Sequence, residues 1–291
     1  MKTVFTTGGE LSGTGAPVEN ATPANLASLQ NINGIAIAAS PDANMYSGAD
    51  ADSFKLRDRA ASGKLFYNPV DTQTQPPGVA ANGFGGSYTG NTLRFSYGDS
   101  RAKTLTASGT ILSARPVIPT GDFSMFVPVM FQAAGNGDFL GGANRGSVTP
   151  YWWWYMNGNG FLKIHNDGND AALYSGSTDL RGGAPVLIEI HHSPDTSTED
   201  NASTNIYLDG ASVATATGAS DFRGDANRRL AIGSSVTAAG AIGTPAICDI
   251  GTIFIVSGRT LDSGNAADTA DLNLIMTYYE NEYGLTLPTR S

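Results

Sequence analysis

The sequence predicts an all-β sandwich with one helix near its C-terminus, because of its composition and the spacing of its apolar runs. Of 291 residues, 36 are glycine and only 15% are charged, which is typical of short strands joined by many turns. About ten short apolar runs follow one another from residue 34 onward, separated by turn residues and by no long linker. With 41% hydrophobic residues the chain can bury one large core, so we expect a single sandwich.

The first 31 residues are expected to form an arm. They contain the Gly-rich stretch TTGGELSGTGAP, followed by TPANLASLQN, which suits a helical turn. Gly-rich termini are ordered only where something holds them, and a neighbouring subunit is one candidate. We therefore predict an arm for assembly or attachment over residues 1–31 and one domain over residues 32–291.

The apolar runs give the expected strands of the domain, and two turns predict which of them pair. Asn157-Gly158 and Asn159-Gly160 can supply the positive φ angles of a tight hairpin, and Asp209-Gly210 can reverse the chain in the same way. The expected strands lie in residues 34–39, 53–58, 91–97, 123–131, 151–156, 161–165, 185–192, 205–210, 229–235 and 249–257.

One helix is expected, over residues 267–283. Its apolar residues recur at i, i+3, i+4 and i+7, so they form one stripe that can pack on the edge of the sandwich. Gly284 stands where the helix would end, and Leu285 can fold back as the hydrophobic contact of a C-cap. The stripe consists of Leu272, Ile275, Met276 and Tyr279.

Four motifs follow one another in the C-terminal half. They are a strand ending in Tyr-x-Asp-Gly, a Leu-x-Ile-Gly strand, an Ile-Gly-x-Ile strand with an Arg-x-Leu loop, and a helix ending in Tyr-Gly-Leu. The motif residues are Tyr207, Asp209, Gly210, Leu230, Ile232, Gly233, Ile250, Gly251, Ile253, Arg259, Leu261, Tyr283, Gly284 and Leu285. This order resembles the laminin-G-like, concanavalin-A-like jelly-roll family. Asp58, Ser62 and Gly63, with the strand NTLRFSY, extend the resemblance to roughly residues 32–288.

The resemblance implies a jelly-roll sandwich with one C-terminal helix, and it leaves the function open. The family includes lectin-like modules, adhesins, hydrolases and viral particle proteins, and one fold hosts many functions. Its glucanases carry a Glu-x-Asp-x-Glu strand, because retaining hydrolysis needs two carboxyl groups about 5 Å apart. No such strand is present in this sequence.

The run YWWWYM at residues 151–156 is the first candidate site. Side chains alternate along a strand, so one triplet of this run is expected in the core and the other outside. One face would carry Tyr151, Trp153 and Tyr155, and the other Trp152, Trp154 and Met156. Outward rings can contact another protein, lie under the chain's own segments, or stack on sugar. The candidate contact residues are Tyr151, Trp152, Trp153, Trp154, Tyr155, Asn157, Asn159 and Asp167.

Glu189 and His191 are the candidates for catalysis. They share one face of the strand LIEIHH, where an exposed polar face is the favoured interpretation and an acid–base pair the alternative. The sequence has no Gly-x-Ser-x-Gly elbow, phosphate-binding loop or zinc spacing. We expect no enzyme and no cofactor, with calcium as the one metal to consider. The acidic turns that could hold calcium contain Asp195, Glu199 and Asp200, and Asp167 and Asp170.

Charge, cysteine content and the N-terminal sequence limit the expected binding partners and cell compartment. A net charge of −9 and a pI near 4.7 disfavour nucleic acid and anionic membrane surfaces. The single Cys248 lies in an apolar run and is expected to be a buried thiol, so no internal disulfide forms. The N-terminus lacks the apolar stretch of a secretory signal, and we expect synthesis in the cytoplasm.

These expectations lead to three hypotheses. The first is a non-enzymatic structural protein of a bacteriophage particle, a capsid-decoration, head-spike or tail-adhesion subunit that is made in the host cytoplasm and located in the virion. Residues 1–31 would contact other particle proteins or sister subunits, with a trimer expected by analogy. The second is a module that binds host surface polysaccharide through residues 151–155. The third is a polysaccharide lyase or hydrolase that uses Glu189 and His191.

Overall fold

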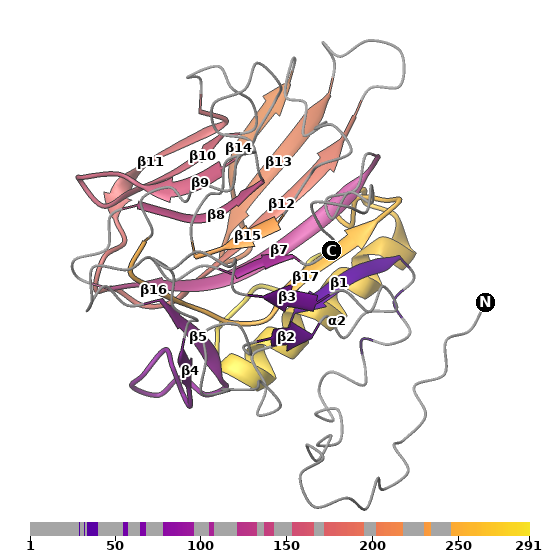
Figure 1. Ribbon diagram of the computed structural model, residues 1–291. Coiled ribbons are helices and arrows are strands. Elements are labelled where there is room, and N and C mark those ends of the chain that lie inside the picture. The colour runs from indigo at the N-terminus through magenta and orange to yellow at the C-terminus, as the bar shows by residue number, and fades with distance from the viewer. Residues whose placement is uncertain are drawn as a thin grey trace, which may run out of the picture.

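The computed structural model contains two antiparallel sheets packed face to face, with one long helix on the outside (Figure 1). It describes residues 29, 32, 34–39, 55–57, 65–67, 78–95, 105–107, 121–132, 137–142, 153–165, 172–194, 202–217, 230–233 and 246–291. The predicted all-β sandwich with a C-terminal helix is confirmed. The predicted arm lies outside the described residues except for Leu29, which is buried.

The sheet next to the helix, called sheet A, has nine strands among the described residues. Strand β7 lies near its centre and pairs with three neighbours, so most other strands are placed relative to it. In order they are β14 (Ala211–Thr217), β13 (Ser203–Leu208), β12 (Val186–Ser193), β7 (Phe123–Phe131), β16 (Cys248–Ile250), β5 (Thr92–Phe95) and β4 (Gly78–Ala80). Beside this row, β17 (Ile253–Ser257) pairs with β7, and β1 (Ile35–Ala39) pairs with β17.

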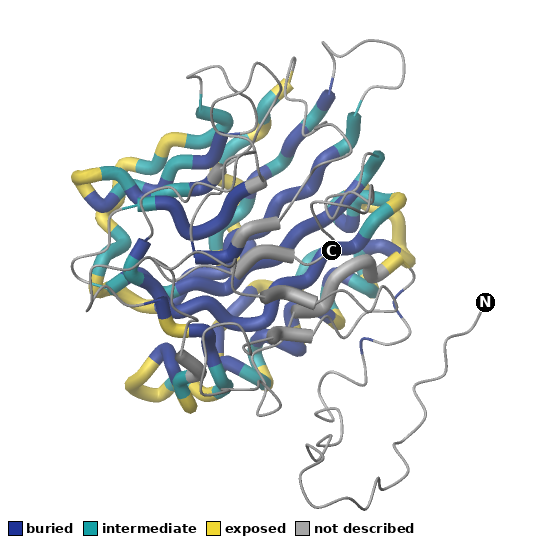
Figure 2. Tube along the Cα trace, viewed as in Figure 1, coloured by how far each residue is buried: buried dark blue, intermediate teal, exposed yellow. Residues whose placement is uncertain are grey.

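The second sheet, called sheet B, has eight strands among the described residues and faces sheet A. In order they are β11 (Tyr174–Asp179), β10 (Phe161–His165), β9 (Trp153–Met156), β8 (Gly137–Gly142), β15 (Leu230–Ile232), β6 (Leu105–Ala107), β3 (Leu65–Tyr67) and β2 (Lys55–Arg57). Along the described residues, Figure 2 shows buried positions at the centres of strands and exposed ones at the turns.

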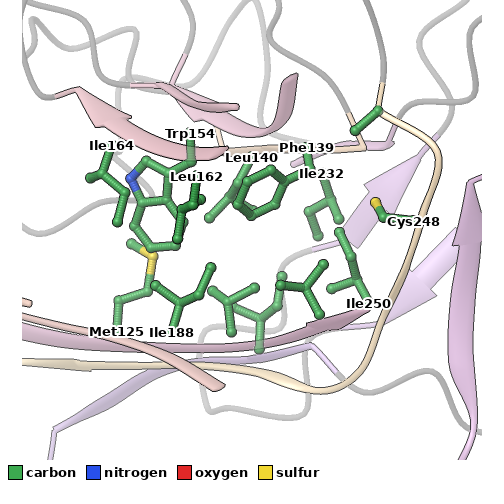
Figure 3. Close-up of a cluster of buried hydrophobic side chains, with 14 of the residues drawn as sticks. Met125, Phe139, Leu140, Trp154, Leu162, Ile164, Ile188, Ile232, Cys248 and Ile250 are labelled. Carbon is green, nitrogen blue, oxygen red and sulfur yellow. The ribbon is translucent and has the colours of Figure 1, made fainter. Parts of the chain in front are cut away.

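The main core fills the space between the sheets. Trp154 of sheet B is fully buried there, opposite Met125 and Ile188 of sheet A (Figure 3). Cys248 lies in the same core, and burial raises the pKa of its thiol well above the ordinary value. The expectation of a buried cysteine is therefore confirmed.

Both predicted hairpins are present. Strands β9 and β10 pair with Leu162 opposite Met156, and β13 pairs with β14 across Asp209-Gly210, where both residues have positive φ. In the β9–β10 turn, however, only Gly160 has a positive φ. Asn157 stabilises this turn through its side chain, whose Oδ1 accepts hydrogen bonds from the backbone N–H groups of residues 159 and 161 at 2.9 and 3.0 Å.

Helix α2 (Ala266–Tyr283) packs on the outer face of sheet A. Its first turn is capped by the Asn265 side chain and its end by Gly284 at φ 70°, as the sequence predicted for the C-terminus. All four residues of the predicted stripe are buried. Arg259 of the Arg-x-Leu motif pairs with Asp268 and Asp271 in the first turns of the helix, and so fixes its start.

Three tyrosines of α2 also attach the helix to the sheet, which the stripe alone does not predict. Tyr278 and Tyr283 each place a hydroxyl 2.8 Å from Oγ1 of Thr252, at the start of β17. Tyr279 donates to the Thr252 carbonyl at 2.9 Å. Because all these groups are buried, their mutual hydrogen bonds remove most of the cost of leaving water.

Candidate functional site

The aromatic run divides between the core and the outer face of sheet B. Trp154 is 0% exposed and Met156 lies beside it in the core, whereas Tyr155 points outward and is half-buried. The two described members of the triplet Trp152, Trp154 and Met156 are therefore the ones in the core. Trp153 belongs to β9 by its backbone, and Tyr151 and Trp152 lie outside the described residues.

Strand register places Tyr155 in a row of side chains across four strands. Tyr155 of β9 lies opposite Asp138 of β8 on one side and opposite Lys163 of β10 on the other. Lys163 in turn lies opposite Ser175 of β11. Along the row from Asp138 to Ser175, the first side chain is buried, the next two are half-buried and the last is exposed. This Tyr155 row therefore opens toward the β11 edge of sheet B (Figure 1).

Two further rings border the Tyr155 row. The imidazole of His165 lies 5.5 Å from the Tyr155 ring at an interplanar angle of 31°, so it restricts the orientation of that ring. Phe161 alternates with the core residue Leu162 on β10 and is half-buried, so it faces outward like Lys163. Aromatic faces next to an acceptor, a cation and a hydroxyl are the kind of surface on which a sugar ring can stack and form hydrogen bonds.

The two predicted asparagines lie at the tip of the β9–β10 hairpin. The oxygen of Asn157 is occupied by the turn, and Asn159 is exposed. Gly160 of this turn lies under the side chains of Asp179 and Arg181. The hydrogen bond from Arg181 to Asp179 lowers the pKa of Asp179 to about 2. The predicted contact residue Asp167 lies outside the described residues.

Glu189 and His191 share one face of β12, as predicted, but that face is not exposed. Both side chains are buried on the outer face of sheet A, where α2 and the C-terminal residues cover them. The Arg290 guanidinium lies 3.1 and 3.2 Å from the two Glu189 carboxylate oxygens. The expectation of an exposed polar face is therefore wrong, because the sequence did not reveal which residues fold over this strand.

The surroundings of His191 do not form an acid–base relay. Its Nδ1 lies 2.8 Å from Ser124 Oγ and 3.9 Å from Asp262, so serine and carboxylate are at the same ring nitrogen. A catalytic triad needs them at opposite nitrogens. Nε2 faces Glu189 at 3.6 Å, and this carboxylate is 0% exposed.

The same buried group extends toward the C-terminus. Asp262 accepts hydrogen bonds from Asn205 at 2.8 Å and from the Tyr207 hydroxyl at 3.3 Å. The Arg290 guanidinium stacks 4.1 Å above the Tyr207 ring. We call Ser124, Glu189, His191, Asp262 and Arg290 the Glu189 network. It links β7, β12, the loop before α2 and the C-terminal segment, and its Asp262 and Arg290 were not recognised from the sequence.

The described residues show neither a metal-binding cluster nor a membrane-spanning helix. Within them no group of three or more His, Cys, Asp and Glu side chains could hold a metal ion. The calcium candidates Asp195, Glu199 and Asp200 are outside these residues, as is Asp170. No helix in the described part of the chain is long and apolar enough to cross a membrane.

Comparisons with known proteins show the fold. No family model matches the chain, and no curated protein matches it. The binding domain of botulinum neurotoxin DC in complex with rat synaptotagmin II is 12% identical, with a TM-score of 0.51 over 85% of this chain and 51% of that one. The botulinum neurotoxin serotype D binding domain is 11% identical, with a TM-score of 0.51 over 87% of this chain and 53% of that one.

A third solved structure concerns botulinum neurotoxin type C, whose ability to enter cells depends on interaction with two ganglioside molecules. It is 12% identical, with a TM-score of 0.51 over 84% of this chain and 51% of that one. The chain thus spans about half the length of these three structures. They share the β-sandwich that the sequence predicted, and at such identities the likeness extends to the fold alone.

Proposed function

We propose that the chain is a non-enzymatic glycan-binding module and that its ligand lies on the Tyr155 row. The observation that carries this proposal is the half-buried Tyr155 ring between Asp138 and Lys163, with His165 against it. A sugar stacked on that ring would meet the ammonium donor of Lys163 on the open side of the row, whereas the buried Asp138 bounds the other side. The strand backbone places Lys163, so binding has to order only its side chain.

The structural neighbours support a binding module over an enzyme. Three are toxin binding domains or toxins of the same fold, and the type C toxin interacts with gangliosides. Because this chain matches only about half of each, the ligand positions in those toxins do not locate a site in this chain. The location of the site rests on the Tyr155 row alone.

A glycan array with the full chain, in calcium and in chelator, tests the proposal and identifies a ligand. Calorimetry with that ligand should then show that Tyr155→Ala weakens binding at least about tenfold, because central aromatic contacts dominate such interfaces. Leu274→Ala is the matched control, since Leu274 is an exposed apolar side chain on α2, the opposite side of the sandwich. Equal affinities of Tyr155→Ala and the unchanged chain would contradict the proposal.

The second candidate is the bacteriophage particle subunit, located in the virion, that the sequence suggested. One observation favours an attachment role for the N-terminus: Leu29, 1% exposed, packs in the cluster that contains α2. The chain therefore joins the domain on the α2 side, and the Tyr155 row faces away from it. Such an arrangement suits a subunit attached at one side that binds at the other, so the two candidates are compatible.

Light scattering tests this second candidate on the full chain and on a version without residues 1–24, which retains Leu29. A trimer or other oligomer that dissociates to folded monomers on truncation would support assembly through the arm. Identical monomers from both versions would contradict self-association through residues 1–24.

A further inference from the structure

We infer that the ligand of the Tyr155 row is an acidic polysaccharide and that Lys163 binds its sugar carboxylate. This inference rests on the proposed glycan-binding function and specifies the class of glycan. Lys163 lies directly opposite Tyr155 in the strand register, on the outer face of sheet B. A carboxylate on a sugar stacked over Tyr155 would therefore lie next to the ammonium group of Lys163.

The other cations whose side chains are described are already paired. Arg94 binds Asp249, Arg181 binds Asp179, Arg259 binds Asp268 and Asp271, and Arg290 binds Glu189. Lys163 is the exception: within the described part of the chain it forms no ion pair and no side-chain hydrogen bond. In a chain with net charge −9, a half-buried cation that has no carboxylate beside it can accept an anionic partner without breaking an existing pair.

The surroundings of Lys163 also suit a sugar acid. Phe161 precedes it by two residues on the same outer face, and Tyr155 lies across from it in the strand register, so two aromatic residues flank Lys163 on the sheet. Lysine can lay its aliphatic stem along such rings and present the charge at their edge. Ser175, the next residue of the row, is exposed and uncharged, so the β11 side leaves access to Lys163.

Asp138 gives the bound sugar a direction. It lies on the other side of Tyr155, two strands from Lys163, or about 10 Å across the sheet, and it is 5% exposed. Its negative charge disfavours a second sugar acid group at that end of the row. The row therefore favours a ring whose acid group lies toward β10.

The net negative charge of the chain does not prevent this recognition. At physiological ionic strength charges are screened over about 8 Å, so the contacting group dominates over the distant acidic residues. Binding should still weaken as salt is raised, because one half-buried ion pair at the surface carries the selectivity.

Isothermal titration calorimetry on the full chain can test the inference with three carboxylated probes: oligogalacturonate, hyaluronate oligosaccharides and oligosialic acid. The fully methyl-esterified form of each probe keeps the sugar rings and removes the charge. We expect a carboxylated probe to bind at least about tenfold more tightly than its ester, since a charge-assisted contact is lost in the ester. Lys163→Gln should remove that preference, and Lys163→Arg should retain it.

Each outcome has a separate meaning. An acid-over-ester preference that Lys163→Gln abolishes, with Tyr155→Ala weakening both forms, supports the inference. If a neutral glycan binds, and Tyr155→Ala abolishes its binding while Lys163→Gln leaves it unchanged, the acidic class is refuted and the glycan-binding function stands. If Tyr155→Ala changes no glycan interaction, the proposed function is refuted and the inference with it.

Discussion

Two charged side chains, Glu189 on the outer face of sheet A and Lys163 on the outer face of sheet B, are in opposite states. On sheet A, under α2, the buried Glu189 carboxylate has the Arg290 guanidinium against it, and Asp262 accepts two hydrogen bonds. On sheet B, Lys163 has no ion pair in the described part of the chain. Helix α2 and the C-terminal segment cover the Glu189 network, so its polar groups must be satisfied internally, whereas Lys163 is half-buried and its charge is unpaired among the described residues. This contrast is the basis of the binding role that we propose for sheet B.

The largest expected contrast lies between neighbours in β9. Trp154→Ala removes a fully buried ring from the core and should lower the free energy of unfolding by about 4 kcal/mol. Tyr155→Ala removes a half-buried outward ring and should cost about 1 kcal/mol or less. Urea unfolding of both variants measures the difference, and equal losses would show that the two rings are not divided between core and surface.

Arg290→Ala should have the next largest effect. It leaves the Glu189 carboxylate buried without its cation, and breaking such a pair costs about 3 kcal/mol of unfolding free energy. Replacing both residues by methionine should recover most of this loss, since neither charge of the pair is then buried without its partner. If Arg290→Ala unfolds at the same urea concentration as the unchanged chain, the Glu189 network does not hold the C-terminal segment in place.

Thr252→Val should lower the free energy of unfolding by a smaller amount. It keeps the shape of the side chain but removes the hydroxyl that meets Tyr278 and Tyr283, at a cost of about 2 kcal/mol. Thr215→Val, on the exposed strand β14, is the matched control and should change stability by less than about 0.5 kcal/mol. Equal stabilities of the two variants would mean that the tyrosine hydroxyls are satisfied elsewhere.

The smallest effect concerns pH. The hydrogen bond from Arg181 lowers the Asp179 pKa from 3.8 to about 2, so ionised Asp179 favours the folded state. Its contribution is fully present above about pH 4 and is lost as the pH falls toward 2. Asp179→Asn should therefore reduce stability slightly at neutral pH, and the gap to the unchanged chain should close between pH 4 and 2. Thermal unfolding across that range measures it, and a gap that stays constant would contradict the assignment.

Local patterns in the sequence predicted much of this architecture. Period-two alternation correctly divided residues 154–156 between core and surface, and turn residues placed two hairpins. The helical spacing of Leu272 and Ile275 identified the face of α2 that packs on the sheet. The Asn-Gly pair also indicated the hydrogen bonds of the Asn157 side chain, because asparagine in a turn often accepts hydrogen bonds from nearby backbone N–H groups. These features depend on residues close together in the chain.

The remainder depends on contacts between distant residues. Glu189 and Arg290 are 101 positions apart, so no spacing rule could show that the carboxylate is buried and paired. The proposed role of Lys163 likewise depends on the register that sets it beside Tyr155 and on the pairing of the other described cations. A single lysine in a strand carries no such information by itself.

Hydrogen–deuterium exchange on the full chain, with and without the tightest glycan from the array, tests the division between the two faces most directly. We predict slower exchange in residues 153–165 on glycan binding and unchanged exchange in α2, because the ligand would lie on the outer face of sheet B. Protection confined to α2 or to the C-terminal segment, with residues 153–165 unaffected, would contradict the account.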